Sequence, residues 1–227
     1  MSLAHRETIE ALYLRCPTAE FRMALDRAVA GMTAAPLLAV VSSPFYLVEL
    51  LRRIPGDLVV SGDGRFDPDP WLAPAAGWAW GRLASGGLHS ESKYSNLFWA
   101  EPQNDMADST AAALRQVASP QAQLYIVVSS FLRGYLPAWQ QEPHPAQNPL
   151  SGVTIPGLLR RAGWQVEQVL GFHSPSAVLW SLAMRSARLV GRPDWEDRAR
   201  LAMRAAYRQE GAMWRLCPLA LIRARAV

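Results

Sequence analysis

Two adjacent serines, Ser42 and Ser43, stand where a buried strand is expected to turn into a helix. They follow the apolar run Leu37–Val41 and precede Pro44 and Phe45. In α/β domains that bind nucleotides or cofactors, this junction usually carries glycines, because the chain turns tightly and the ligand approaches the backbone. The junction here contains no glycine. Its two hydroxyl groups could offer hydrogen bonds to a ligand in place of glycine amides.

Asp63, Glu101 and His173 each follow a predicted strand. Ligands of α/β sheets bind at the carboxyl ends of the strands, so all three are candidate site residues, with Glu101 a contact to cofactor or acceptor. His173 has an ordinary pKa that suits a general base for an acceptor hydroxyl. No partner that would orient its ring is evident, so we favour a loop histidine hydrogen-bonded to nearby backbone. Asp63 is flanked by Gly62 and Gly64, a pattern equally typical of a turn.

Other kinds of catalytic site have no support in the sequence. The histidines and cysteines are not at metal-ligand spacing, so no metal site is expected and the cysteines are read as reduced, buried thiols. The chain contains neither the Gly-x-Ser-x-Gly elbow of serine hydrolases nor a phosphate-binding Gly-Lys-Ser/Thr motif. The histidines and cysteines of the chain are His5, His89, His144, His173, Cys16 and Cys217.

The charge of the chain points to a globular protein without a dedicated polyanion partner. The formal net charge of +4 comes almost wholly from arginine, since Lys93 is the only lysine. No nucleic-acid-binding module accompanies the basic residues near the end, so a solvated helix face is expected rather than a nucleic-acid site. No apolar run is long enough to span a bilayer and no signal peptide is evident, so we expect a cytoplasmic protein. The clustered basic residues are Arg185, Arg188, Arg192, Arg198, Arg200, Arg204 and Arg208.

Alternating strand and helix patterns predict one α/β domain over residues 1–227, preceded by a helical extension in residues 1–35. The sheet is expected to be doubly wound and mostly parallel, with helices on both faces and an antiparallel final strand. Leu37–Val41 is continuously apolar, as in a parallel strand covered on both faces. The final strand contains Pro218, which argues for an edge position or a bulge.

The segment Ile155–Phe172 resembles the late part of class I S-adenosylmethionine-dependent methyltransferases. In that family a leucine-rich helix ends in Leu-x-x-Ala-Gly-Phe/Trp, and the next strand pairs with the final strand. The matching residues are Leu158, Leu159, Ala162, Gly163 and Trp164. The resemblance implies a Rossmann-like fold, S-adenosylmethionine as cofactor and a small-molecule acceptor. It also implies that Asp63, beyond the second strand, binds the ribose hydroxyls of the cofactor.

The first strand departs from the pattern of that family, in which an acid and a Gly-x-Gly-x-Gly loop hold the cofactor. The acid falls on Ala39 and the glycines fall on Val41, Ser43 and Phe45. A turn with positive φ would strain Val41, and Pro44 removes a backbone donor from the loop. Two functions therefore stay open: a methyltransferase with an altered cofactor loop, or a non-catalytic relative used for binding or assembly. The sequence also leaves open whether the protein forms a homo-oligomer.

Overall fold

The computed structural model describes residues 18–54, 56–63, 66–75, 82–86, 88, 91–102, 106–129, 154–217 and 219–227. The strands are β1 (Leu37–Val41), β2 (Leu58–Gly62), β3 (Leu83–Ser85), β4 (Tyr94–Ala100), β5 (Ala118–Ser129), β6 (Trp164–Phe172), β7 (Arg208–Glu210) and β8 (Leu219–Ala226). The helices are α2 (Thr18–Val29), α3 (Pro44–Leu51), α4 (Asp69–Ala75), α5 (Ala107–Val117), α6 (Ile155–Arg161), α7 (Pro175–Leu189), α8 (Pro193–Ala206) and the 3-10 helix η4 (Gly211–Leu216). Within the predicted N-terminal helical extension, α2 is the described part, and residues 1–17 lie outside the described residues.

The strands form one mixed sheet in the order β3-β2-β1-β4-β5-β8-β6-β7. β1 pairs in parallel with β2 on one side and with β4 on the other, and β4 continues in parallel to β5. β8 runs antiparallel to both β5 and β6. The predicted mostly parallel sheet with an antiparallel final strand is therefore confirmed. From β1 the sheet is built first through β2 to β3 on one side, and then from β4 onward on the other side of β1. This reversal makes the carboxyl ends of β1 and β4 the topological switch point of the sheet.

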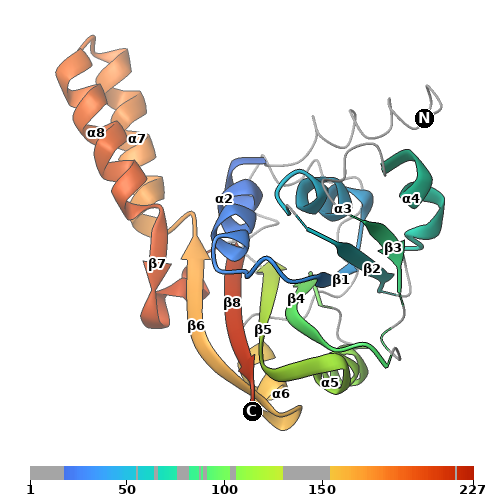
Figure 1. The fold of residues 1–227 in the computed structure, drawn as a ribbon. Helices are drawn as coiled ribbons and strands as arrows, with labels where there is room; N and C mark the ends of the chain where they lie inside the picture. The colour runs from blue at the N-terminus through green and yellow to red at the C-terminus, as the bar shows by residue number, and fades with distance from the viewer. Residues whose placement is uncertain are drawn as a thin grey trace.

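Helices cover both faces of the central strands (Figure 1). Leu37, Ala39 and Val41 of β1 belong to the core under α2 and α3, whereas Leu38 and Val40 belong to the core under α5 and α6. All five side chains are at most 1% exposed. Because successive side chains of a strand point to opposite faces, only a strand covered on both sides buries such a continuous apolar run.

An ionic cluster fixes α3, whose first residue lies directly after the Ser42-Ser43 junction. The side chain of Glu49 is fully buried and forms an ion pair with Arg53, which lies two residues beyond the end of α3. Arg53 also binds Asp26 of α2, with Nε 2.7 Å from Oδ1. A buried carboxylate is tolerated only when it is paired in this way. The cluster therefore ties the C-terminal end of α3 to α2.

The Ala-Gly-Trp signature has a local structural cause. Gly163 adopts φ +81° directly after α6, a left-handed conformation that favours glycine at the end of a helix. The next residue, Trp164, begins β6, is 1% exposed and donates a hydrogen bond from Nε1 to the carbonyl oxygen of Ala111, at 3.2 Å. The signature therefore turns the chain from α6 into β6 and anchors the strand on α5.

Pro218 predicted an edge position or a bulge for the final strand, and the edge position is wrong because the strand lies inside the sheet. β8 pairs with β5 along one side and with β6 along the other. The strand begins at Leu219, directly after Pro218, which itself lies outside the described residues. A proline that precedes the first paired residue removes no hydrogen bond from the ladder, and it therefore does not exclude an interior position.

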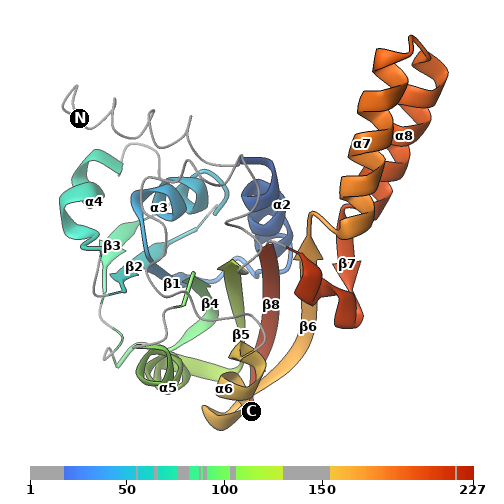
Figure 2. The same cartoon turned by 180° about the vertical axis from the view of Figure 1, so that it is seen from behind.

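The last two helices do not cover the sheet. α7 and α8 pack on each other as an antiparallel pair, here called the α7–α8 hairpin, which extends away from the sheet beyond β6 (Figures 1 and 2). Ser174 begins it as predicted, because its Oγ accepts a hydrogen bond from the backbone N–H of Ala177 at 3.2 Å. None of the described helices has the length and apolar content that a membrane crossing requires.

Candidate functional site

Three of the predicted site residues come together at the switch point of the sheet. Val41 is in register with Gly62 of β2, so the next residues, Ser42 and Asp63, follow the two strands at one level. Val40 is in register with Trp99 of β4, which brings Glu101 to the level of Ser42 on the other side. Parallel strands are about 4.8 Å apart, so the three residues follow neighbouring strands within about 10 Å across the sheet.

The junction after β1 is built without a left-handed residue. Ser43 is extended, with φ −162° and ψ 161°, and Pro44 is the first residue of α3. The non-glycine residues with positive φ in the described chain are Glu101, Gln121 and His173, so the strain expected for Val41 does not arise. Proline suits the first position of a helix, because the N–H that it lacks has no partner within the helix there. The chain therefore enters α3 through an extended serine and a proline, without a glycine turn.

The Ser42 hydroxyl is buried at this junction. Its Oγ is shielded from solvent and has no hydrogen-bond partner among the described residues. Leaving a buried hydroxyl unpaired costs about 1–3 kcal/mol. The hydroxyl lies two residues before α3, whose N-terminus carries partial positive charge from its backbone N–H groups. This part of the site therefore offers a donor or acceptor for a polar group that is anionic or electron-rich.

Asp63 lies in a tight turn and is half-buried. Its Oδ1 accepts a hydrogen bond from the backbone N–H of Phe66 at 3.3 Å. A Cβ on Gly62 would lie 1.9 Å from the carbonyl oxygen of Phe66, so the close approach requires glycine there. The turn role considered for Asp63 is therefore real. A carboxylate has several lone pairs, so a role in the turn does not by itself exclude a ligand hydroxyl.

Glu101 is a buried acid in a strained conformation. It is 8% exposed, adopts φ +46°, and donates its backbone N–H to the carbonyl oxygen of Val127 at 2.8 Å. A left-handed conformation costs a residue with a Cβ about 1–2 kcal/mol. Such strain concentrates at binding and active sites, where the surrounding structure imposes it. The turn that redirects the chain after β4 therefore carries an acidic side chain at the switch point.

His173 lies on the same sheet edge but apart from the other three residues. It follows β6, which is separated from β4 by β5 and β8, so three strand spacings, about 14 Å, lie between His173 and Glu101 across the sheet. Its φ is +63°, and its ring centroid lies 5.4 Å from that of Tyr207. Tyr207 is a neighbour that the sequence did not reveal, because no local spacing links the two residues.

The described residues contain no cluster of three His, Cys, Asp or Glu side chains that could hold a metal ion. Cys217 is a buried free thiol whose pKa is raised to about 11 by burial, so it stays protonated at neutral pH. His89 and His144 lie outside the described residues, as do Cys16 and His5.

Comparisons with solved structures identify the fold of the chain. No protein-family model matches the chain, and no curated protein matches it by sequence. Among solved structures, an S-adenosylmethionine-dependent methyltransferase from Thermotoga maritima matches with a TM-score of 0.51 and 11% identity, over 91% of this chain and 89% of its own. A TehB-like S-adenosylmethionine-dependent methyltransferase from Corynebacterium glutamicum matches with a TM-score of 0.51 and 11% identity, over 91% and 86% of the two chains.

A third structure with this fold is a 4+2 cyclase, SpnF, with a TM-score of 0.51 and 10% identity, over 91% of this chain and 79% of its own. The same architecture therefore serves more than one kind of chemistry, and at these identities the likeness concerns the fold alone. The resemblance seen in Ile155–Phe172 is therefore confirmed for the fold. The chain has the Rossmann-like fold of class I S-adenosylmethionine-dependent methyltransferases.

Proposed function

We propose that this protein binds S-adenosylmethionine at the carboxyl ends of β2, β1 and β4 and transfers its methyl group to a small molecule. The observation that carries the proposal is the register of these three strands, which places Ser42, Asp63 and Glu101 side by side just beyond the strand ends. Open α/β sheets bind their ligands at this switch point. The shared fold with S-adenosylmethionine-dependent methyltransferases supports the choice of cofactor.

The residues present fit the polar parts of that cofactor. The unpartnered, buried hydroxyl of Ser42 would hydrogen-bond the amino-acid portion, with Ser43 beside it in place of the glycine amides. Asp63 would accept hydrogen bonds from the ribose hydroxyls. Glu101 would accept a hydrogen bond from the cofactor or from the acceptor. The serine hydroxyls can hydrogen-bond a carboxylate or an amine, and the carboxylates of Asp63 and Glu101 can accept hydrogen bonds from hydroxyl groups.

When bound, the cofactor supplies an electrophilic methyl group on a sulfonium centre. An acceptor lone pair would form the new bond to that methyl carbon as the carbon–sulfur bond breaks, and the bonding electrons would leave with the sulfur. The acceptor loses a proton where its nucleophile carried one. The protein contributes chiefly by orienting the two reactants and excluding water. His173 would take the proton only from an acceptor that extends across β5 and β8 toward β6.

A second function is favoured by a specific feature of the β1–α3 junction. Val41 is fully buried, and Pro44 supplies no backbone N–H at the start of α3. A non-catalytic protein that keeps the fold for binding or assembly would need no glycine loop at this position. In that case Ser42, Asp63 and Glu101 would have no role toward S-adenosylmethionine.

Calorimetric titration with S-adenosylmethionine and S-adenosylhomocysteine tests the proposal, with thermal denaturation alongside. Ligand at a hundredfold excess over its dissociation constant should stabilise the protein by about 2.7 kcal/mol. We expect micromolar binding that Asp63→Ala weakens at least tenfold. Asp67→Ala is the matched control, because Asp67 also supports a local turn, with Oδ1 3.0 Å from the backbone N of Asp69, but lies further along the loop.

Two results would decide against the methyltransferase. The first is the absence of heat and of any thermal shift up to millimolar concentrations of both ligands. The second is equal weakening by Asp63→Ala and Asp67→Ala, which would trace the loss to the turn rather than to a ribose contact. Either outcome would leave the non-catalytic protein as the better description.

A further inference from the structure

Glu101 is held in a conformation that its local sequence opposes. Its φ of +46° is left-handed, and it precedes Pro102, although a residue before proline favours an extended conformation. A hydrogen bond of 2.8 Å from its backbone N–H to the carbonyl oxygen of Val127 ties it to β5. Both Glu101 and Pro102 are buried. The tertiary structure therefore imposes this conformation, and such imposed strain is concentrated at binding sites.

Glu101 and Asp63 lie on opposite sides of Ser42. β1 pairs with β2 along one side and with β4 along the other, so the three residues follow strands in the order β2, β1, β4 (Figure 1). With Asp63 at the ribose and Ser42 at the amino-acid portion of the cofactor, as proposed above, Glu101 is furthest from the ribose. Its carboxylate is then the group that remains for the transferred methyl group and its acceptor.

The side-chain charge at this edge of the sheet is negative. The described residues that directly follow β1, β2 and β4 include the carboxylates of Asp63 and Glu101 and no basic side chain. The N-terminus of α3 contributes partial positive charge, but it does so beside Ser42. A buried carboxylate is stabilised by a cation next to it and repels an anion. The Glu101 side of the site therefore favours a positively charged group.

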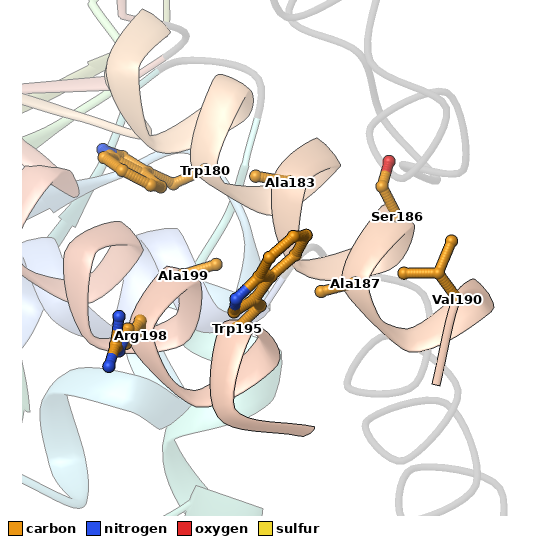
Figure 3. A pocket seen from close by; sticks show the side chains of 8 residues that line it. All are labelled: Trp180, Ala183, Ser186, Ala187, Val190, Trp195, Arg198 and Ala199. Carbon is orange, nitrogen blue, oxygen red and sulfur yellow. The ribbon is translucent and has the colours of Figure 1, made fainter. Parts of the chain in front are cut away.

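Two grooves elsewhere on the described chain carry the opposite charge. The groove between α7 and α8 has a volume of about 530 Å³, and Arg198 alone among its eight lining residues is charged (Figure 3). The ring of Trp195 in this groove is already covered by Arg192, whose Cζ lies 5.1 Å from the ring centroid. A groove of about 510 Å³ at the amino ends of β2, β3 and β4 contains two basic residues, Arg82 and Lys93, against one acid. A cation is therefore favoured at the carboxyl edge of the sheet rather than in either groove.

We infer that Glu101 binds positive charge at the position of methyl transfer, and that the acceptor is an amine; this rests on the proposed function. An amine nitrogen that takes up the methyl group becomes positively charged as the sulfur becomes neutral, so a cation stays beside Glu101 during the transfer. A methylated amine that still carries a hydrogen would then lose a proton to water. Glu101 would instead repel an alkoxide or carboxylate acceptor, whose methylation would also remove the charge that Glu101 stabilises.

Calorimetric titration of the full chain with three adenosyl ligands tests the inference. S-adenosylmethionine and sinefungin carry positive charge at the transfer position, on a sulfonium and on an ammonium group, whereas S-adenosylhomocysteine is neutral there. Glu101→Gln keeps the size of the side chain and removes its charge, so we expect it to weaken the first two ligands at least about tenfold. S-adenosylhomocysteine should keep its wild-type affinity. Asp63→Asn is the matched control and should weaken all three ligands equally, because all three contain the ribose.

Circular dichroism checks the fold of each variant, and Glu101→Gly, which suits φ +46°, replaces Glu101→Gln if that variant is unfolded. Equal weakening of all three ligands by Glu101→Gln would place Glu101 at the shared amino-acid portion and overturn the inference. Unchanged affinity for all three would overturn it as well. If none of the three binds the wild type, the cofactor site itself is refuted, and the inference with it. Methylation of an alcohol or a carboxylic acid by the wild type would refute the assignment of an amine.

Discussion

Ser42 and Glu101 follow neighbouring parallel strands at the same level, two residues beyond the paired Val40 and Trp99. One contributes a buried hydroxyl without a described partner, and the other a buried carboxylate on a left-handed backbone. Both features cost free energy in the folded protein, and both lie at the point where α/β sheets bind ligands. Their coincidence is the strongest physical indication of a site in this molecule.

Replacing Ser42 with alanine should stabilise the protein without ligand while weakening the binding of S-adenosylmethionine. Removal of an unpaired, buried hydroxyl relieves its desolvation penalty, and we expect a gain of about 1 kcal/mol in the free energy of unfolding. Urea denaturation measures the gain, and calorimetry measures the binding. Ser43→Ala is the control, with no comparable gain expected. A loss of stability in Ser42→Ala would contradict the prediction, since it would mean that the hydroxyl already has a partner.

Glycine should be better tolerated than alanine at Glu101, because φ +46° strains any side chain with a Cβ. We expect Glu101→Gly to be more stable than Glu101→Ala by about 1 kcal/mol. Gln121, exposed and at φ +64°, is the matched control for backbone strain and should show the same order. Only the Glu101 variants should weaken the binding of S-adenosylmethionine. Equal binding by all four variants would remove Glu101 from the site.

Alanine should have opposite effects at two glycines around α6. Gly163→Ala places a Cβ on a residue with φ +81° and should lower the free energy of unfolding by about 1–2 kcal/mol. Gly157 lies inside α6, where an added Cβ would meet only the Arg161 side chain, at 3.9 Å. Gly157→Ala should therefore raise stability by up to about 1 kcal/mol. Chemical denaturation distinguishes the two, and a gain in both would disprove the role given to Gly163.

Acid should weaken the α7–α8 hairpin through Glu196. Its hydrogen bond with Arg188 lowers the pKa of the Glu196 carboxyl below its ordinary value. A carboxyl with a depressed pKa in the folded state stabilises the protein above its unfolded pKa, about 4.3, and this contribution is lost as pH falls through the folded value. Thermal midpoints between about pH 7 and 3 should fall less steeply for Glu196→Gln than for the wild type. Parallel curves would show that the ion pairs contribute nothing.

Features that depend on neighbouring residues could be predicted from the amino-acid sequence. The unbroken apolar run of β1 required a strand covered on both faces, Ser174-Pro175 marked the start of α7, and Gly163 marked the end of α6. The position of Ser42 and Asp63 at the carboxyl edge also follows from local order, since each comes directly after its strand. Turn, cap and burial patterns carry this information because their causes lie within a few residues.

The contacts between segments that are distant in the sequence became known from the fold. The insertion of β8 between β5 and β6 separates His173 from Glu101, although both follow strands at the same edge. No local pattern encodes the order of strands in a sheet, because non-local pairing sets it. The apolar residues of α7, such as Leu179 and Leu182, have the same spacing whether they face a core or solvent, and here they are 67% and 54% exposed. Helical periodicity predicts that a helix has an apolar face, but whether that face packs on a core or is exposed to solvent depends on the fold.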